Sequence, residues 1–75
     1  MVHVWYKNKS GVVQSFVRKE TLLDADMFLM SELSGRAYMS EYSRNDKEER
    51  VVISYFGVGK EKGEKELIGV AVTIP

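Results

Sequence analysis

The sequence contains no cysteine and only one histidine, His3. Without cysteine the chain has no disulfide bond, no thiolate ligand for a metal and no thiol nucleophile. A lone histidine lacks imidazole partners for a metal site, and the sequence marks no serine or carboxylate as its catalytic partner. We therefore predict no catalytic residue, no metal and no cofactor. His3 is expected to be a half-exposed residue of a strand, on the same face as Trp5.

Net charge and long apolar runs are missing as well. The 11 basic and 11 acidic side chains cancel, which argues against a dedicated nucleic-acid binder, because such proteins derive much of their affinity from neutralising phosphates. No segment approaches the roughly 20 apolar residues that span a bilayer, and no signal peptide is visible at the N-terminus. We expect a soluble cytoplasmic chain, and the absence of cysteine agrees with that expectation.

What the sequence does contain suffices for one small domain, residues 1–75. A chain of this length buries a modest core and has marginal stability unless something adds to it. Since disulfides and thiolate-bound metals are absent, either core packing suffices or a second chain supplies further burial. The sequence therefore leaves self-association as one way in which the chain gains stability.

The residue pattern predicts secondary structure in the order ββαβββ. β-branched and aromatic residues, separated by turn residues, predict strands over 2–6, 12–19, 37–43, 50–57 and 66–75. Thr21 and Asp24 form a capping-box pattern at the start of a helix over 22–34, and Gly35 follows its end. One helix packed on a mostly antiparallel five-stranded sheet is the simplest two-layer arrangement of these elements, which places the chain in the α+β class.

A glycine-rich segment, residues 57–65, invites comparison with phosphate-binding loops. Its glycines match neither G-x-x-x-x-G-K-[ST] nor G-x-G-x-x-G, and it leads into a predicted strand, whereas phosphate loops lead into a helix. Lysines and glutamates alternate along it and offset one another. We predict a solvated hairpin loop.

The predicted helix carries more apolar residues than one contact surface needs. The stripe expected to face the sheet comprises Leu22, Ala25, Leu29 and Leu33. A second stripe beside it comprises Leu23, Met27 and Met30. Phe28 lies on the opposite side of the helix, where the sequence indicates no intramolecular partner. In a small domain with one helix, the second stripe has few neighbours to bury it.

Two interpretations of the second stripe remain open. In the first, loops and the ends of the sheet cover it, and methionine fills the irregular gaps. In the second, the stripe and Phe28 form an exposed patch for a partner protein or a second copy, and the partner-binding residues are Leu23, Met27, Phe28 and Met30.

The strands suggest two further contact surfaces. Apolar residues occur at both parities in several strands, for example Val52 beside Ile53, so the sheet face that one helix leaves uncovered is expected to be partly apolar. In the last strand, the residues predicted to share one face are Ile68, Val70, Val72 and Ile74. If that strand lies at an edge of the sheet, it is able to pair with a strand of a partner.

Charge is divided along the chain and supports an alternative function. Residues 1–19 carry four basic and no acidic side chains, whereas residues 20–34 carry four acidic and no basic ones. Aromatic side chains on a sheet stack on bases while basic side chains follow the backbone. The candidate nucleic-acid-binding residues of the basic N-terminal hairpin are Trp5, Lys7, Lys9, Arg18 and Lys19. The competing interpretation assigns the aromatics to the core and the lysines to solubility.

From these observations the sequence predicts a small non-catalytic protein–protein interaction module. It would bind through the helix over 22–34 and through an exposed face or edge of the sheet, with another protein or a second copy as partner. An accessory subunit, or an inhibitor encoded by a phage or other mobile element, fits the size and the lack of catalytic residues. A nucleic-acid-binding domain is the alternative, and no membrane partner is predicted.

Overall fold

The computed structural model describes residues 1–59 and 64–74. Within them the chain forms five strands and one helix: β1 (Val2–Lys7), β2 (Val13–Lys19), α1 (Leu22–Glu32), β3 (Tyr38–Asn45), β4 (Arg50–Val58) and β5 (Lys65–Thr73). The predicted ββαβββ order and α+β class are confirmed, and every bound lies within two residues of its prediction. The middle of the predicted loop over 57–65 lies outside the described residues.

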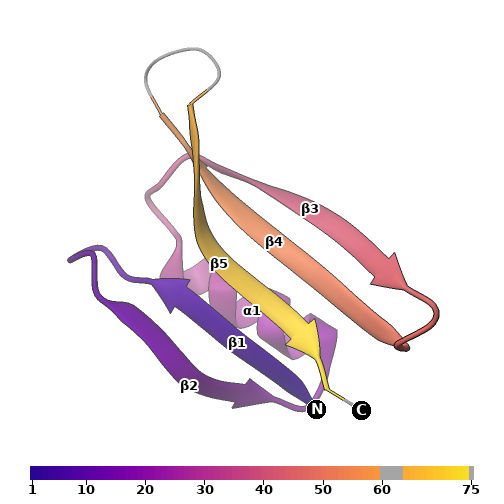
Figure 1. Cartoon of the computed structure of the whole chain (residues 1–75). Coiled ribbons are helices and arrows are strands. Elements are labelled where there is room, and N and C mark those ends of the chain that lie inside the picture. The colour runs from indigo at the N-terminus through magenta and orange to yellow at the C-terminus, as the bar shows by residue number, and fades with distance from the viewer. Residues whose placement is uncertain (60–63, 75) are drawn as a thin grey trace.

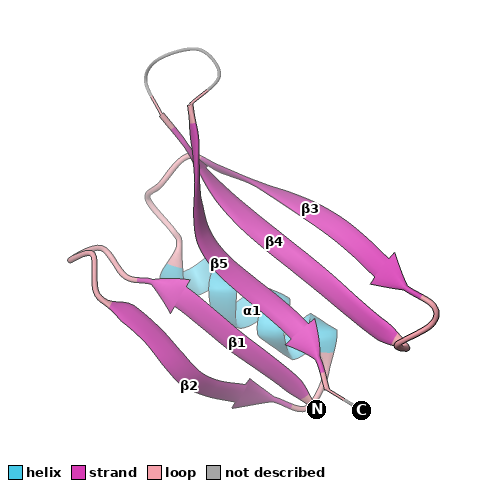
Figure 2. Cartoon of the chain, viewed as in Figure 1, coloured by secondary structure: helices cyan, strands magenta, loops and turns pink. Residues whose placement is uncertain are grey.

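The strands form one antiparallel sheet in the order β2-β1-β5-β4-β3. α1 connects β2 to β3, which lie at opposite edges, and it crosses one face of the sheet (Figure 1 and Figure 2). The last strand, β5, lies between β1 and β4. The condition under which this strand would pair with a partner strand is therefore not met, and the edges of the sheet are β2 and β3.

The helix begins where its capping residues predict. Thr21 is the N-cap, and its Oγ1 accepts a hydrogen bond from the backbone N–H of Asp24 at 3.1 Å. Asp24 lies in the first turn, where its negative charge meets the positive end of the helix dipole. Beyond the last helical residue, Gly35 has a φ of +85°, a left-handed conformation that glycine adopts without the steric cost of a Cβ atom.

Replacing Thr21 with alanine is expected to lower the free energy of unfolding by about 1 kcal/mol, because one N–H of the first turn loses its acceptor. Urea denaturation followed by circular dichroism measures the change. Thr21→Ser keeps the hydroxyl and is the matched control, which we expect to retain most of the stability. Equal losses in the two variants would contradict the capping role of the hydroxyl.

The core lies between α1 and one face of the sheet. Ala25, Leu29 and Leu33 are completely buried, and Leu22 packs beside them, so the stripe expected to face the sheet does so. The sheet contributes the buried residues Val2, Val4, Tyr6, Tyr55, Ile68 and Ala71. Because alternate residues of a strand point to opposite faces, this set also identifies the residues of the uncovered face.

A β-bulge in β5 changes the face to which one predicted residue belongs. Tyr55 pairs with Gly69 and Phe56 pairs with Leu67, which leaves Ile68 as an extra residue in β5. The bulge places Ile68 in the core, where it is 3% exposed. The prediction that Ile68 shares a face with Val70 is therefore wrong.

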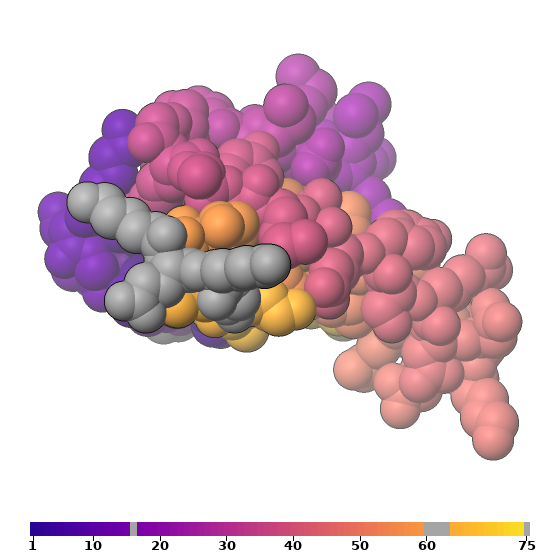
Figure 3. All heavy atoms as spheres, turned by 90° about the horizontal axis from the view of Figure 1, so that it is seen from above, coloured from indigo at the N-terminus to yellow at the C-terminus, as the bar shows by residue number. Residues whose placement is uncertain are grey.

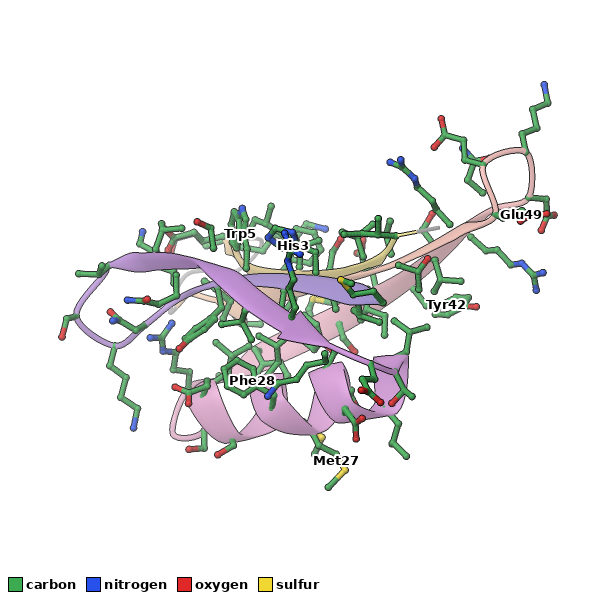
Figure 4. The ribbon with its side chains drawn as sticks, turned by 90° about the horizontal axis from the view of Figure 1, so that it is seen from below. His3, Trp5, Met27, Phe28, Tyr42 and Glu49 are labelled. Carbon is green, nitrogen blue, oxygen red and sulfur yellow. The ribbon has the colours of Figure 1, made fainter. Side chains whose placement is uncertain are left out.

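The helix covers only part of its face of the sheet. It packs against β5, β1 and β2, whereas the β3–β4 hairpin projects from the body of the molecule (Figure 3). Figure 4 shows Glu49 in the turn at the tip of this hairpin, far from the helix. Every residue of β3 after Tyr38 is exposed. Apart from the contact between Asp26 and Tyr55 of β4, no described element opposes the flank of α1 on the side of this hairpin.

Candidate protein-binding surfaces

The second stripe of the helix lies on the surface. Leu23 is 68% exposed, Met27 60% and Met30 52%. The three follow a spacing of i, i+4 and i+7, which aligns them along one flank of α1, and Met27 points away from the sheet (Figure 4). The described loops and strand ends therefore do not cover this stripe, contrary to the first of the two interpretations drawn from the sequence.

Asp26 marks the border between the buried and the exposed stripes. Its Oδ1 accepts a hydrogen bond from the Tyr55 hydroxyl at 2.6 Å. Burial of Tyr55 and this hydrogen bond raise the pKa of the phenol well above its ordinary value. The contact fixes the rotation of the helix about its axis, because it holds the flank that carries Asp26 against β4. Leu23 and Met30 lie next to Asp26 on the helix and are turned outward.

Phe28 does not belong to the exposed surface. Its ring packs edge-on against Tyr6, with centroids 5.5 Å apart and planes at 78°, and it joins the rim of the core. The Nζ atom of Lys19 lies 4.5 Å from the centre of the ring, in a cation–π contact. Phe28 therefore has intramolecular partners that the sequence did not indicate, and its side chain holds α1 against the β1–β2 hairpin.

The sheet face opposite α1 is the second surface, and we call it the open face. His3 and Trp5 point away from the helix (Figure 4), and the strand register places Val72, Val52 and Ser43 in line with His3. The apolar centre of the open face comprises Trp5, Val52, Phe56, Leu67, Val70 and Val72. The expectation that the face left uncovered by the helix is partly apolar is confirmed.

Charged residues surround the apolar centre of the open face. At the β2 edge, Arg18 pairs with His3 in the register. At the β3 edge, Glu41 lies 3.4 Å from the Nζ atom of Lys65, and the same Nζ lies 4.7 Å from the centre of the Phe56 ring. An apolar centre with a charged rim is the usual composition of a protein interface.

Sequence reasoning missed one exposed aromatic residue on the other side of the sheet. Tyr42 is 65% exposed, and its register with Ile53 and Ala71 places it on the face that carries the helix. It lies on the projecting hairpin beyond the end of α1 (Figure 4). The sequence offered little to predict this exposure, because apolar and polar residues alternate only loosely in the strand that contains Tyr42.

The predicted nucleic-acid-binding residues do not form one surface. Trp5, Lys7 and Arg18 belong to the open face, whereas Lys19 lies on the helix side over Phe28 and Lys9 lies in the turn after β1. Lys7 forms an ion pair with Glu66 at 2.6 Å, and this contact lowers the pKa of the Glu66 carboxyl. Lys7 and Lys19 therefore each have a partner within the chain.

His3 has a structural contact. Its Nε2 lies 2.6 Å from the carbonyl oxygen of Ser15, so this nitrogen donates a hydrogen bond that ties β1 to β2. Over residues 1–59 and 64–74, no group of three His, Asp or Glu side chains is placed to hold a metal ion. In the same part of the chain, no helix combines the length and the apolar composition that crossing a membrane requires.

The fold defines a small α+β protein with one helix on an antiparallel sheet. Comparison of the chain with models of protein families, with curated proteins and with solved structures found no match.

Proposed function

We propose that the chain is a non-catalytic module that binds another protein through the stripe formed by Leu23, Met27 and Met30. The observation that carries this proposal is the exposure of all three side chains, each more than half accessible, on one flank of the only helix in the described residues. Large apolar side chains that adjoin one another in this way mark contact surfaces more often than isolated ones do.

The spacing and chemistry of the stripe suggest the kind of partner. Anchors at i, i+4 and i+7 are those by which an amphipathic helix lies in an apolar groove, and methionine adapts its shape to such grooves. Acidic residues flank the stripe, since Glu20 and Asp24 are exposed beside it. A partner with an apolar groove and a basic rim would complement both features.

The biological role that fits this surface is that of an accessory protein or an inhibitor, which acts by occupying a site on its partner. This role needs no catalytic residue, and a cytoplasmic location remains the expectation from the absence of cysteine. The nucleic-acid alternative is supported less well, because its basic residues are divided between two faces of the sheet and two of them already contact Glu66 and Phe28.

Met27→Lys combined with Met30→Lys is expected to abolish recovery of the partner when the tagged chain is purified from the cells that produce it. Two lysines would have to enter an apolar groove without counter-ions. Stability should change by less than about 0.5 kcal/mol, because both positions are exposed.

The matched control adds the same two charges at Val12 and Val13, which are 53% and 54% exposed; Val12 lies in the turn before β2 and Val13 is the first residue of β2. We expect this control to recover the same proteins as the wild type. If the Met27→Lys/Met30→Lys variant also recovers them in full, the helix stripe is not the binding surface.

A further inference from the structure

The open face of the sheet is a contact surface independent of the helix stripe. Its six central residues come from three adjacent strands, β1, β5 and β4, and lie on the side of the sheet opposite α1. No described element of the chain packs on it. We propose that this face is a dimer interface, on which a second copy of the chain packs its own open face.

The area of the face matches what a dimer requires. Five strands about 4.8 Å apart, each about 7 residues long at roughly 3.3 Å per residue, present about 550 Å². Two such faces bury about 1,100 Å² in total, which is above the roughly 1,000 Å² expected of a specific interface.

The whole chain also exposes more surface than its mass predicts. It exposes 5409 Å², whereas a compact monomer of 8.6 kDa exposes about 4,700 Å². The excess of roughly 700 Å² is comparable to the 800 Å² or so that each partner buries in a standard complex.

The charges on the rim favour a second copy over an unrelated partner, because the face is complementary to itself. Arg18 lies at the β2 edge and Glu41 at the β3 edge. A two-fold axis parallel to the strands and between the two sheets places the β2 edge of each copy over the β3 edge of the other. Each Arg18 then lies over Ser43 of the other copy. Glu41 is two residues, about 7 Å, along the same strand, within reach of the long arginine side chain, while the apolar centres meet with the sheets about 10 Å apart.

This dimer would leave the helices on its two outer sides. Both stripes of Leu23, Met27 and Met30 would remain accessible, so one dimer would present two copies of the binding surface and gain avidity for a partner with two sites. The dimer does not depend on the proposed function, since the two surfaces lie on opposite sides of the sheet.

Analytical ultracentrifugation tests the dimer with a variant designed to keep the fold. Val52 and Val72 are directly opposite on neighbouring strands, so Val52→Glu with Val72→Lys places an ion pair across them within one chain. At about 100 μM we expect the wild type to sediment at twice the chain mass of 8.6 kDa and the double variant at the chain mass with its circular dichroism retained. Met27→Lys should leave the dimer unchanged.

The proposal is overturned if the wild type sediments as a monomer, if the double variant is as dimeric as the wild type, or if Met27→Lys dissociates the dimer. A monomeric wild type whose partner recovery still depends on Met27 and Met30 would refute the dimer alone and leave the proposed function standing. A dimeric wild type whose partner recovery does not depend on Met27 and Met30 would refute the proposed function and leave the dimer standing.

Trp5 provides a second readout, because it is the only tryptophan in the chain and lies in the open face. In the dimer its ring is shielded, so the wild type should fluoresce at shorter wavelength and resist acrylamide quenching more than the Val52→Glu/Val72→Lys variant. Identical spectra and identical quenching for the two proteins would overturn the proposal.

A charge exchange tests the two-fold arrangement. Arg18→Glu alone, or Glu41→Arg alone, should weaken the dimer about tenfold by placing like charges together. The two changes combined should restore it, because each new glutamate then lies within reach of a new arginine. If the combined variant is weaker than either single one, Arg18 and Glu41 do not face each other and this arrangement is wrong.

Discussion

Leu29→Ala is expected to cost about 3–5 kcal/mol of folding free energy. Leu29 is completely buried at the centre of the helix–sheet contact, and its Cδ2 atom lies over Gly69 of the central strand. Truncation to alanine leaves a cavity that the flat backbone under the helix is unable to fill. A chain of 75 residues has a total stability of about 4–11 kcal/mol, so this one change removes a large share of it.

Leu23→Ala is the matched control for this prediction, since it makes the same truncation on the same helix at a position that is 68% exposed. It should change the free energy of unfolding by less than about 0.5 kcal/mol. Urea denaturation of both variants and the wild type at one fixed protein concentration gives the comparison. Similar losses at the two positions would mean that α1 does not lie on the sheet through the stripe that contains Leu29.

Tyr55→Phe is expected to cost about 1.5–3 kcal/mol, the range for a buried hydrogen bond to a charged group. The Tyr55 ring is 1% exposed, and its hydroxyl donates to Asp26 at 2.6 Å. Phenylalanine keeps the packing of the ring but leaves the partly buried carboxylate of Asp26 without this donor. Tyr42→Phe, at a position that is 65% exposed, should have little effect. If Tyr55→Phe costs no more than this control, the hydrogen bond contributes nothing to the position of the helix.

Tyr55 also makes the stability of the protein depend on pH in the alkaline range. The pKa of Tyr55 is raised in the native state from an ordinary value of 10.0. Above pH 10 the unfolded chain therefore loses a proton that the native chain keeps, so stability is fully present below pH 10 and falls as the pH rises further. In Tyr55→Phe this fall should be smaller but still present, because burial and Glu32 also raise the pKa of Tyr6. Denaturation curves recorded across this pH range measure the difference, and an unchanged slope would contradict the assignment.

Local patterns were sufficient to predict the elements of the fold. The cap at Thr21, the stripe that contains Leu29 and the β-branched runs are properties of adjacent residues, so the helix and all five strands were predicted within two residues. Strand order was not predicted, because alternation specifies faces and does not specify neighbours. The central position of β5 follows from its pairing with β1 at the other end of the chain.

Two features of side chains were missed for the same reason. A helical wheel places Phe28 away from the sheet-facing stripe, but it contains no information on the ring of Tyr6, which reaches Phe28 from β1. Alternation assigns Ile68 to the face of Val70, but a bulge adds one residue and reverses the parity of everything before it. Gly69 was the only local sign of that bulge, and a glycine in a strand has several other causes.

The candidate surfaces were predicted to different degrees. Exposure of Leu23, Met27 and Met30 was one of two interpretations of the sequence, and the structure shows these side chains on the surface. Their accessibility depends on how far the sheet extends beside the helix, which composition does not specify. The open face was expected from apolar residues at both parities, whereas its boundary and the placement of Arg18 and Glu41 at opposite edges required the strand order.

Photo-crosslinking in the cells that produce the protein tests the central proposal, binding of another protein through the helix stripe, most directly. A photoreactive phenylalanine derivative would replace Met27 on the stripe, and Glu49 at the tip of the projecting hairpin would serve as the control position (Figure 4). The prediction is a discrete covalent adduct with another protein from position 27 and no such adduct from position 49. Adducts from position 49 alone, or adducts from position 27 that contain only a second copy of the chain, would contradict it.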